Sequence, residues 1–428
     1  MSTTPDTDLL SLHIQQGALT GRRDGGVYRF SAIPFAQAPV GDLRFKPPVP
    51  AGSWQGTRDA TRPGPIAPQL PSRLANVMGD IHNEQSEDCL HLTVWTPAAD
   101  AKRRPVLVWL HGGAWQSGGG ALDWYNGAAL AEKGDLVVVT PNYRLAALGW
   151  LHVPGETANV GLLDQEAAIQ WVVENIEAFG GDPENITLMG QSAGATSIAC
   201  LMARQARYPR VIVQSASMGR GFWSSADAAS LAGLVLEAAG AKDLDHARTL
   251  PYSTFLKAQQ APQVVQALKE KGAGRALFSP VVDGEVIASD AADILPEVAT
   301  QADVLIGYTQ DEMAAFPGFD TGPASHAVGD RIFGAPSRQW AEYAARAGRK
   351  AYLYRFDYAP TECFGACHCI ELPFVFGTLC AFQDAPMLHA APASHMEGLV
   401  DTMQRQWIDF IRGGAPETSV FPHLTTFK

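Results

Sequence analysis

The stretch GGDPENITLMGQSAGA, residues 180 to 195, carries the features that decide the fold. ITLMG is apolar like a buried strand, and AGATSIACLMARQA (193–206) has the spacing of a helix. Between them stands Ser192 in the pattern G-x-S-x-G, with Gly190 and Gly194 on either side. A turn this tight forces its apex residue into a strained conformation, and larger side chains two positions away would collide. The pattern therefore predicts an exposed serine hydroxyl at a helix N-terminus.

Apolar strands and amphipathic helices alternate along the rest of the chain, which predicts a mostly parallel sheet covered by helices on both faces. We expect one α/β domain over residues 1–428. The predicted strands are 92–95, 105–110, 135–143, 186–190, 210–216, 302–309 and 351–358, and the clearest further helices are 159–179 and 396–414. The proline-rich residues 31–72 are expected to form irregular surface structure that wraps around the core.

Composition excludes several classes of protein. The 428 residues are 46% apolar, and the formal net charge is −12. This charge disfavours a nucleic-acid partner or an anionic membrane, and it argues weakly against highly anionic substrates, although local fields can override net charge. The polar start MSTTPDTDLL does not resemble a signal peptide, and the apolar runs are too short to span a bilayer. With only six cysteines, the expected location is the cytoplasm.

A serine nucleophile needs a base, and the base needs an acid that orients it. In folds with this turn the order along the chain is serine, acid, histidine. Among the histidines after Ser192, only His368 follows a convincing late strand within a loop. Asp311 and Glu312 both follow the strand 302–309, and spacing alone allows either to be the acid.

The glycine-rich stretch LHGGAWQSGGG (110–120) follows another predicted strand. Attack of a serine on a carbonyl group produces a tetrahedral intermediate, whose oxyanion needs fixed N–H donors. One donor is the amide of Ala193, and HGGAW (111–115) is placed to supply others, because glycine lets the backbone approach the substrate. A phosphate-binding loop is the main alternative, but G-x-x-x-x-G-K-[ST] does not occur here.

These motifs together resemble the type B carboxylesterases, relatives of the cholinesterases with the α/β-hydrolase fold. The resemblance covers nearly the whole chain and includes FSAIPFAQAPVGDLRFKPP, SEDCLHLTVWTP, VWLHGGAW, GACHCIELPFVFG and the long run that ends in GQSAGA. It implies a triad of Ser192, Glu312 and His368, with Glu312 rather than Asp311 as the acid. It also implies oxyanion donors at Gly113, Ala114 and Ala193, and an ion pair between Arg44 and Glu87.

The sequence departs from this family at several points. Gln191 stands where the family usually has glutamate, so the limb of the pH–activity profile that reports the base is expected at lower pH. Cys89 has no earlier cysteine to pair with and should be a free thiol. The cap regions are shortened, which predicts a more open site that admits bulkier esters.

Cys363, Cys367 and Cys369 flank His368 in the run CFGACHC. A metal site would need about four ligands, and no second cysteine or histidine pair stands nearby, so packing around the base is the favoured interpretation and no metal is predicted. Alkylation of these thiols is expected to impair catalysis.

The prediction is a serine hydrolase that cleaves small-molecule carboxylic esters through an acyl-enzyme and needs no cofactor. The alternatives are a carbamate, amide or thioester hydrolase, or a binding protein that has lost the chemistry. Five residues flank the catalytic segments and are candidates for the substrate-binding walls, although each could equally be ordinary packing: Met218, Phe222, Trp223, Phe316 and Phe364.

Overall fold

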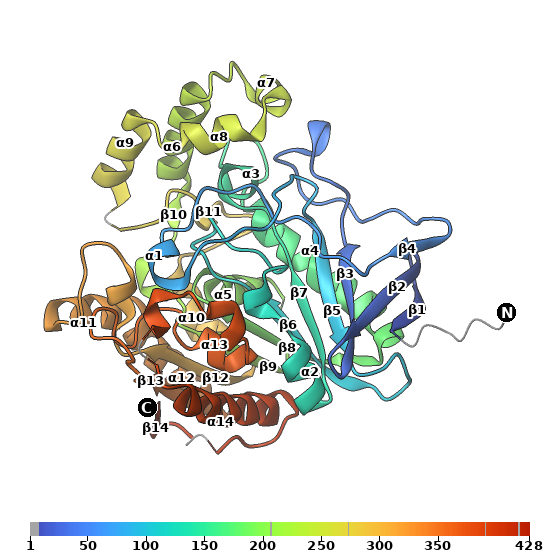
Figure 1. Ribbon diagram of the computed structural model, residues 1–428. Helices are drawn as coiled ribbons and strands as arrows, with labels where there is room; N and C mark the ends of the chain where they lie inside the picture. The colour runs from blue at the N-terminus through green and yellow to red at the C-terminus, as the bar shows by residue number, and fades with distance from the viewer. Residues whose placement is uncertain (1–7, 206–207, 273, 390, 418–419) are drawn as a thin grey trace.

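A twisted sheet of twelve strands runs through the protein in the computed structural model (Figure 1). The structure describes residues 8–205, 208–272, 274–389, 391–417 and 420–428. The strands are β1 Leu9–Ile14, β2 Gly17–Asp24, β3 Val27–Pro34, β4 Thr57–Asp59, β5 His91–Thr96, β6 Arg104–Leu110, β7 Val137–Pro141, β8 Gly181–Gln191, β9 Arg210–Gln214, β12 Asp303–Thr309, β13 Ala351–Phe356 and β14 Leu424–Phe427, and a small separate pair is formed by β10 Trp223–Ser224 and β11 Val281–Val282.

Helices lie in most of the connections between strands from β6 onward. The α-helices are α1 Ala75–Met78, α2 Ala128–Gly134, α3 Ala146–Trp150, α4 Val160–Asn175, α5 Ala193–Arg204, α6 Ser225–Ala238, α7 Leu244–Thr249, α8 Tyr252–Ala258, α9 Pro262–Gly272, α10 Ala291–Val298, α11 Pro323–Gly329, α12 Ala335–Arg346, α13 Leu372–Phe376 and α14 Ala393–Ile411. Shorter turns that matter for the site are η4 Met218–Arg220, η5 Glu312–Ala315 and the π-turn η6 Asp330–Gly334.

The sheet has an antiparallel edge and a parallel body. Its order is β1-β2-β3-β5-β7-β6-β8-β9-β12-β13-β14, with β4 beside β2. The pairs from β1 to β7 in this order are antiparallel, and those from β7 to β14 are parallel. The parallel body brings the carboxyl ends of β8, β12 and β13 to one edge, where catalytic groups of such folds gather.

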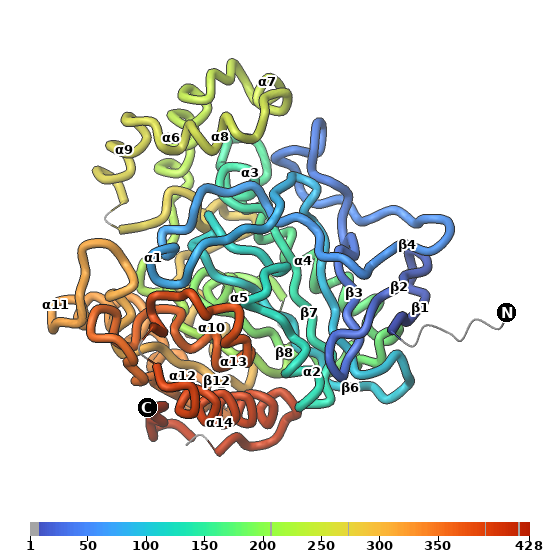
Figure 2. Tube along the Cα trace, viewed as in Figure 1, coloured from blue at the N-terminus to red at the C-terminus, as the bar shows by residue number. Residues whose placement is uncertain are grey.

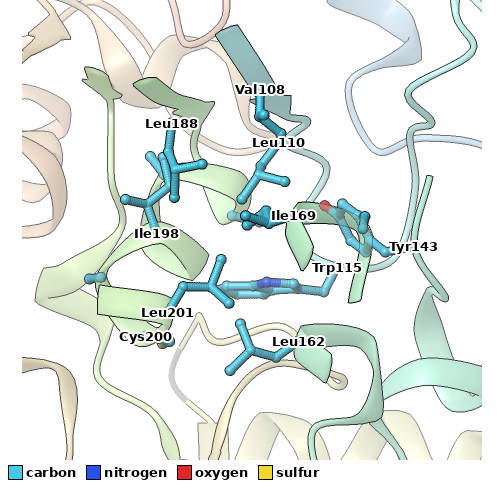
Figure 3. Packing of buried hydrophobic residues seen from close by; sticks show 14 of the residues in the cluster. Val108, Leu110, Trp115, Tyr143, Leu162, Ile169, Leu188, Ile198, Cys200 and Leu201 are labelled. Atoms are coloured by element: carbon cyan, nitrogen blue, oxygen red, sulfur yellow. The ribbon is translucent and has the colours of Figure 1, made fainter. Parts of the chain in front are cut away.

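Each face of the sheet has its own apolar core, because successive strand residues point to opposite faces. In β6, Val106, Val108 and Leu110 join a core with α4 and α5, whereas Leu107 and Trp109 join a core with α2, α13 and α14. Figure 3 shows part of the first core, with side chains from β6, β8, α4 and α5 packed together. Strands buried on both faces explain why their sequences are almost continuously apolar.

Two segments lie outside the layers formed by the sheet and the helices on its faces: helices α6 to α9 and the proline-rich N-terminal wrap. Helices α6 to α9 pack against one another and against α3 at one end of the molecule (Figure 2). The N-terminal wrap is held down by Arg44, whose Nε and Nη2 donate to Glu87 at 2.7 and 2.6 Å. Arg44 Nη1 also donates to the carbonyl oxygens of Arg248 and Leu250, at 2.8 and 2.6 Å. The implied Arg44–Glu87 pair is therefore present, and it joins the wrap to the segment around α7.

Most predicted elements are found within a few residues of their expected ends, and the mostly parallel sheet with helices on both faces is present. The helix expected at 193–206 ends at Arg204, and Ala206 lies outside the described residues. Residues 1–7, which form most of the polar start MSTTPDTDLL, also lie outside them, so the prediction that this start is not a signal peptide is not tested. Among the described helices, none is both long and apolar enough to cross a membrane.

Candidate active site

Ser192 lies at the apex of the turn between β8 and α5. Its backbone has φ 54° and ψ −118°, outside the regions that L-residues favour. Its N–H donates to the carbonyl oxygen of Gln214 at 2.8 Å. A Cβ on Gly194 would lie 1.9 Å from the carbonyl oxygen of Leu110, and one on Gly190 would lie 2.7 Å from the carbonyl carbon of Gly194. Both glycines are therefore required by sterics, as the pattern predicted.

The carboxyl ends of β12 and β13 place a carboxylate beside an imidazole. Nδ1 of His368 is hydrogen-bonded to Oε2 of Glu312, and both side chains are 2% exposed. The other oxygen of Glu312 accepts from the N–H of Thr309 at 3.0 Å, which fixes the carboxylate. Asp311 lies apart, 2.6 Å from Nε2 of His326. Of the two carboxylates that spacing left open, the structure thus brings Glu312 to His368.

The second ring nitrogen of His368 faces the turn that carries the serine. Nε2 lies 3.1 Å from the side-chain nitrogen of Gln191, which also lies 3.2 Å from Sγ of Cys369. An amide N–H can donate to Nε2 only if this nitrogen is unprotonated, which agrees with a proton on Nδ1 directed at Glu312. Ser192 and His368 line the same cavity, without a direct hydrogen bond between them.

Aromatic side chains enclose the imidazole. The ring centroids of Phe316 and Phe333 lie 5.4 and 5.0 Å from that of His368. These rings exclude water from the Glu312–His368 pair, which strengthens its electrostatic interaction. Phe333 belongs to η6, and its role was not visible in the sequence.

The glycine loop packs directly against the serine turn. Gly113, Ala114 and Trp115 have successive positive φ angles of 114°, 54° and 57°. A Cβ on Gly113 would lie 1.9 Å from the carbonyl oxygen of Ser117, so only glycine fits there. Among the described residues, no acceptor is hydrogen-bonded to the N–H groups of Gly113, Ala114 or Ala193. These three donors are available to a ligand.

Trp115 anchors this loop to the core. Its indole N–H donates to Oγ of Ser197 at 3.1 Å, and its carbonyl oxygen accepts from the N–H of Ala146 at 2.8 Å. Figure 3 shows the indole packed among Leu162, Leu201 and Tyr143. A fixed loop can hold N–H donors in place before the substrate arrives, as oxyanion stabilisation requires.

The five predicted substrate-binding residues do not all reach the site. Phe222 and Phe316 line cavities that also contain Ser192. Met218, Trp223 and Phe364 line neither cavity, so the structure does not support a substrate contact for them. Met218 and Trp223 are buried in the core, where the indole N–H of Trp223 donates to Ala276, and Phe364 packs on the second core.

The cysteines around His368 differ in exposure. All six cysteines are free; Cys363 is exposed, whereas Cys367 and Cys369 are buried. Burial raises the pKa of both buried thiols, so they are protonated at neutral pH. Of the three thiols around His368, only Cys363 is open to alkylation in the folded state, so the expected sensitivity of catalysis would have to act through it. In the described residues, no group of three histidine, cysteine or acidic side chains is arranged to hold a metal ion.

A second buried carboxyl group, Glu371, was not singled out from the sequence. It is 1% exposed, and Oε1 accepts from Nε2 of Gln214 at 3.1 Å while Oε2 has no partner. Burial, and then repulsion by Glu312, raises its pKa to about 7. In the sequence CIELPFVF, Glu371 is the one charged residue in an apolar run, and such a residue usually points to solvent. Here its side chain lies in the interior instead.

Glu371→Gln is expected to flatten the pH dependence of the free energy of unfolding between about pH 4.5 and pH 7. Because the folded chain holds this proton more tightly than the unfolded chain, wild-type stability should fall as pH rises through that window, by up to about 3 kcal/mol. Urea unfolding at pH 5 and pH 7.5 measures the effect, with the exposed Glu362→Gln as control. Equal losses in the wild type and the Glu371 variant would contradict the assignment.

The comparisons with known proteins agree with this geometry. The carboxylesterase family model matches residues 8–324 and 320–427. The chain is 36% identical to para-nitrobenzyl esterase of Bacillus subtilis (strain 168), over 94% of this chain and 90% of that protein. It is 38% identical to a probable N-octanoylanthranilate hydrolase of Rhodococcus erythropolis, over 95% and 93%. The solved structure of a thermophilic PNB esterase superposes with a TM-score of 0.86 at 32% identity, over 97% and 94%.

The chain therefore belongs to the carboxylesterase family, with the α/β-hydrolase fold. It is a carboxylic ester hydrolase of the serine hydrolase class. The predicted family, fold and activity are confirmed, and these relatives do not favour the alternative of a binding protein without chemistry.

Proposed function

We propose that Ser192, His368 and Glu312 form the catalytic triad. The observation that carries this proposal is the convergence of three strand ends: the strained serine turn after β8, the carboxylate after β12 and the imidazole after β13. Nε2 of His368 takes the proton of the Ser192 hydroxyl as Oγ attacks the ester carbonyl. The same nitrogen then gives the proton to the leaving alcohol, and Glu312 holds the imidazole in the required tautomer.

The oxyanion of each tetrahedral intermediate is held by the N–H groups of Gly113, Ala114 and Ala193. Their freedom from internal acceptors supports this role. Water then enters, His368 removes its proton, and the acyl-enzyme is hydrolysed. Each donor of this kind typically lowers the barrier by about 3 kcal/mol. The chemistry requires no cofactor, and the cytoplasmic location and the single domain with shortened caps remain predictions.

The triad is tested by covalent trapping. A fluorophosphonate resembles the tetrahedral intermediate and reacts only with an activated serine. Intact-protein mass spectrometry should show one phosphonyl group on the wild type and none on Ser192→Ala. A panel of 4-nitrophenyl esters of increasing acyl length, run on the same two proteins, measures the loss of hydrolysis. Labelling of Ser192→Ala at the wild-type rate would place the nucleophile elsewhere.

Gln191→Glu is expected to move the limb of the kcat/KM profile that reports the base to higher pH, by about one unit. The side-chain nitrogen of Gln191 lies 3.1 Å from Nε2 of His368, so a carboxylate at this position would stabilise the imidazolium and delay release of its proton. Activity at pH 6 should fall more than activity at pH 8. The control is Gln339→Glu, which adds the same charge at an exposed position of α12. An unmoved limb would refute the electrostatic role of Gln191.

A further inference from the structure

Two adjoining cavities meet at the serine. They share Arg73, Ala114, Ser192 and Phe316, but only one of them is lined by His368. Because His368 protonates the leaving alcohol in the proposed mechanism, the alcohol must lie on its side. The cavity that His368 lines is therefore named the alcohol cavity. The other, which contains Ala193, Ser217 and Phe222, is named the acyl cavity.

The acyl cavity is lined by three arginines from distant parts of the sequence. Arg73 precedes α1, Arg220 ends η4, and Arg275 follows α9. The last two are fixed: Arg220 Nη1 donates to the carbonyl oxygen of Gly274, and Arg275 Nε donates to the carbonyl oxygen of Arg220 at 3.0 Å. The guanidinium of Arg275 also lies over the indole ring of Trp223, 5.1 Å from its centroid.

Among the described residues, no carboxylate is in direct contact with the arginines of this cavity, although Asp227 attracts Arg275 and Glu312 attracts Arg220 over longer distances. None of the lining residues is acidic, and none of the three arginines forms an ion pair in the part of the chain that the structure describes. A Cβ on Gly221 would lie 3.0 Å from Oδ2 of Asp290 and 3.4 Å from Nη2 of Arg275, so this carboxylate lies near the cavity. Its Oδ1 accepts from the N–H groups of Phe222 and Ala291. The cationic cavity contrasts with the net charge of −12 of the whole protein.

Like charges crowd Arg220 in particular. Burial, followed by repulsion from Arg73 and Arg331, lowers the pKa of its guanidinium to about 10. Desolvated cations without a counter-ion are unfavourable, and one anion in the cavity would relieve this repulsion. A guanidinium presents a planar fork that matches a carboxylate.

The rest of the wall fits a short hydrocarbon chain. Phe222, Phe316 and Phe333 line the same cavity as the serine and the arginines. Methylene groups that extend from an ester carbonyl at Ser192 would contact these rings, and a terminal carboxylate would then reach the guanidinium groups. The arginines would also offset the repulsion between this carboxylate and the oxyanion that forms during attack.

We propose that the acyl cavity selects esters whose acyl group carries a carboxylate, that is, monoesters of short dicarboxylic acids. Arg220 and Arg275 bind the carboxylate, and Arg73, which is exposed at the junction of the two cavities, attracts it. The proposal rests on the proposed function of Ser192 as nucleophile and goes beyond it, because ester hydrolysis as such does not require an anionic acyl group.

The test is a matched pair of substrates. Mono-4-nitrophenyl glutarate and its methyl ester have the same leaving group and the same number of methylene groups, and differ in one negative charge and one methyl group. Release of 4-nitrophenol gives kcat/KM for each, after subtraction of the rate in buffer, because the free carboxylate can attack its own ester. The wild type should prefer the anionic ester by at least tenfold, equivalent to about 1.4 kcal/mol. This ratio should fall in 0.5 M NaCl, because salt screens the attraction.

Variants assign the preference to the cavity. Arg220→Gln and Arg275→Gln should each lower the anionic-to-neutral ratio by about tenfold, and Arg220→Lys should restore part of it. Arg22→Gln removes the same charge from an exposed position on β2 and should leave the ratio unchanged. Thermal unfolding shows whether each variant is folded. The wild-type ratio and its salt dependence test the proposal even if a variant fails to fold.

The outcomes separate the two proposals. A wild type that cleaves the neutral ester equally well or better overturns the anionic specificity but leaves the nucleophile intact. A ratio that Arg220→Gln and Arg275→Gln leave unchanged overturns the role of these arginines. Undiminished hydrolysis of both esters by Ser192→Ala overturns the proposed function itself.

Discussion

Ser192→Gly is expected to lower kcat by a factor of about 10⁴ to 10⁶ and to raise the free energy of unfolding by about 1 kcal/mol. The loss of activity follows because, in the proposed mechanism, the Ser192 hydroxyl forms the acyl-enzyme. The gain in stability follows because Ser192 is held at φ 54° and ψ −118°, a conformation that glycine adopts with much less strain. Among the described residues, the serine hydroxyl has no hydrogen-bond partner whose loss would offset this gain.

The matched control is Ser192→Ala, which removes the same oxygen but keeps the Cβ. It should be as inactive as the glycine variant without becoming more stable, so the difference between the two isolates the backbone strain. Stopped-flow hydrolysis of 4-nitrophenyl butyrate measures kcat, and urea unfolding measures stability. If the glycine variant is less stable than the alanine variant, the turn is not strained in the way that its angles indicate.

Asp164→Asn is expected to destabilise the fold by about 3 to 5 kcal/mol. Asp164 on α4 accepts from Arg144 three times, from N at 3.0 Å, Nε at 2.8 Å and Nη2 at 2.7 Å. The two side chains are 0% and 3% exposed. Without the carboxylate, the guanidinium would remain buried and unpaired, because water cannot reach it.

The urea midpoint and slope of Asp164→Asn give this loss directly. Asp401→Asn is the control, because it removes a carboxylate from the exposed pair with Lys133 and should leave the midpoint unchanged. A small effect at Asp164, close to that at Asp401, would show that the asparagine amide can satisfy Arg144.

Local patterns carried the sequence-based prediction furthest. The serine turn was predictable because steric contacts within five residues require its glycines. The central strands were predictable because burial on both faces makes them continuously apolar. The antiparallel strands β1 to β3 were missed, because residues 9–34 mix polar and apolar residues at an edge that is only partly buried. The strand β14 is short, and only its last residue, Phe427, is buried.

The site could be predicted only in part, because its residues come together from distant parts of the sequence. Asp311 and Glu312 are adjacent, and only the conformation of η5 decides which of them reaches His368. Arg73, Arg220 and Arg275 are separated by long stretches of chain, so no local pattern could bring them together. Trp223 seemed well placed in sequence, but its strand turns the indole into the core.

The walls of the two cavities come partly from a different part of the chain than the proposed catalytic groups. The reactive groups stand on loops fixed by the ends of β8, β12 and β13, whereas Gln259, Leu268 and Arg275 come from the segment around α8 and α9 at one end of the molecule. Substrate range and reaction chemistry can therefore evolve separately. Substitutions or length changes in the peripheral helices can alter which esters are accepted while leaving bond cleavage intact, so relatives with this fold can come to accept new substrates and keep the same reaction.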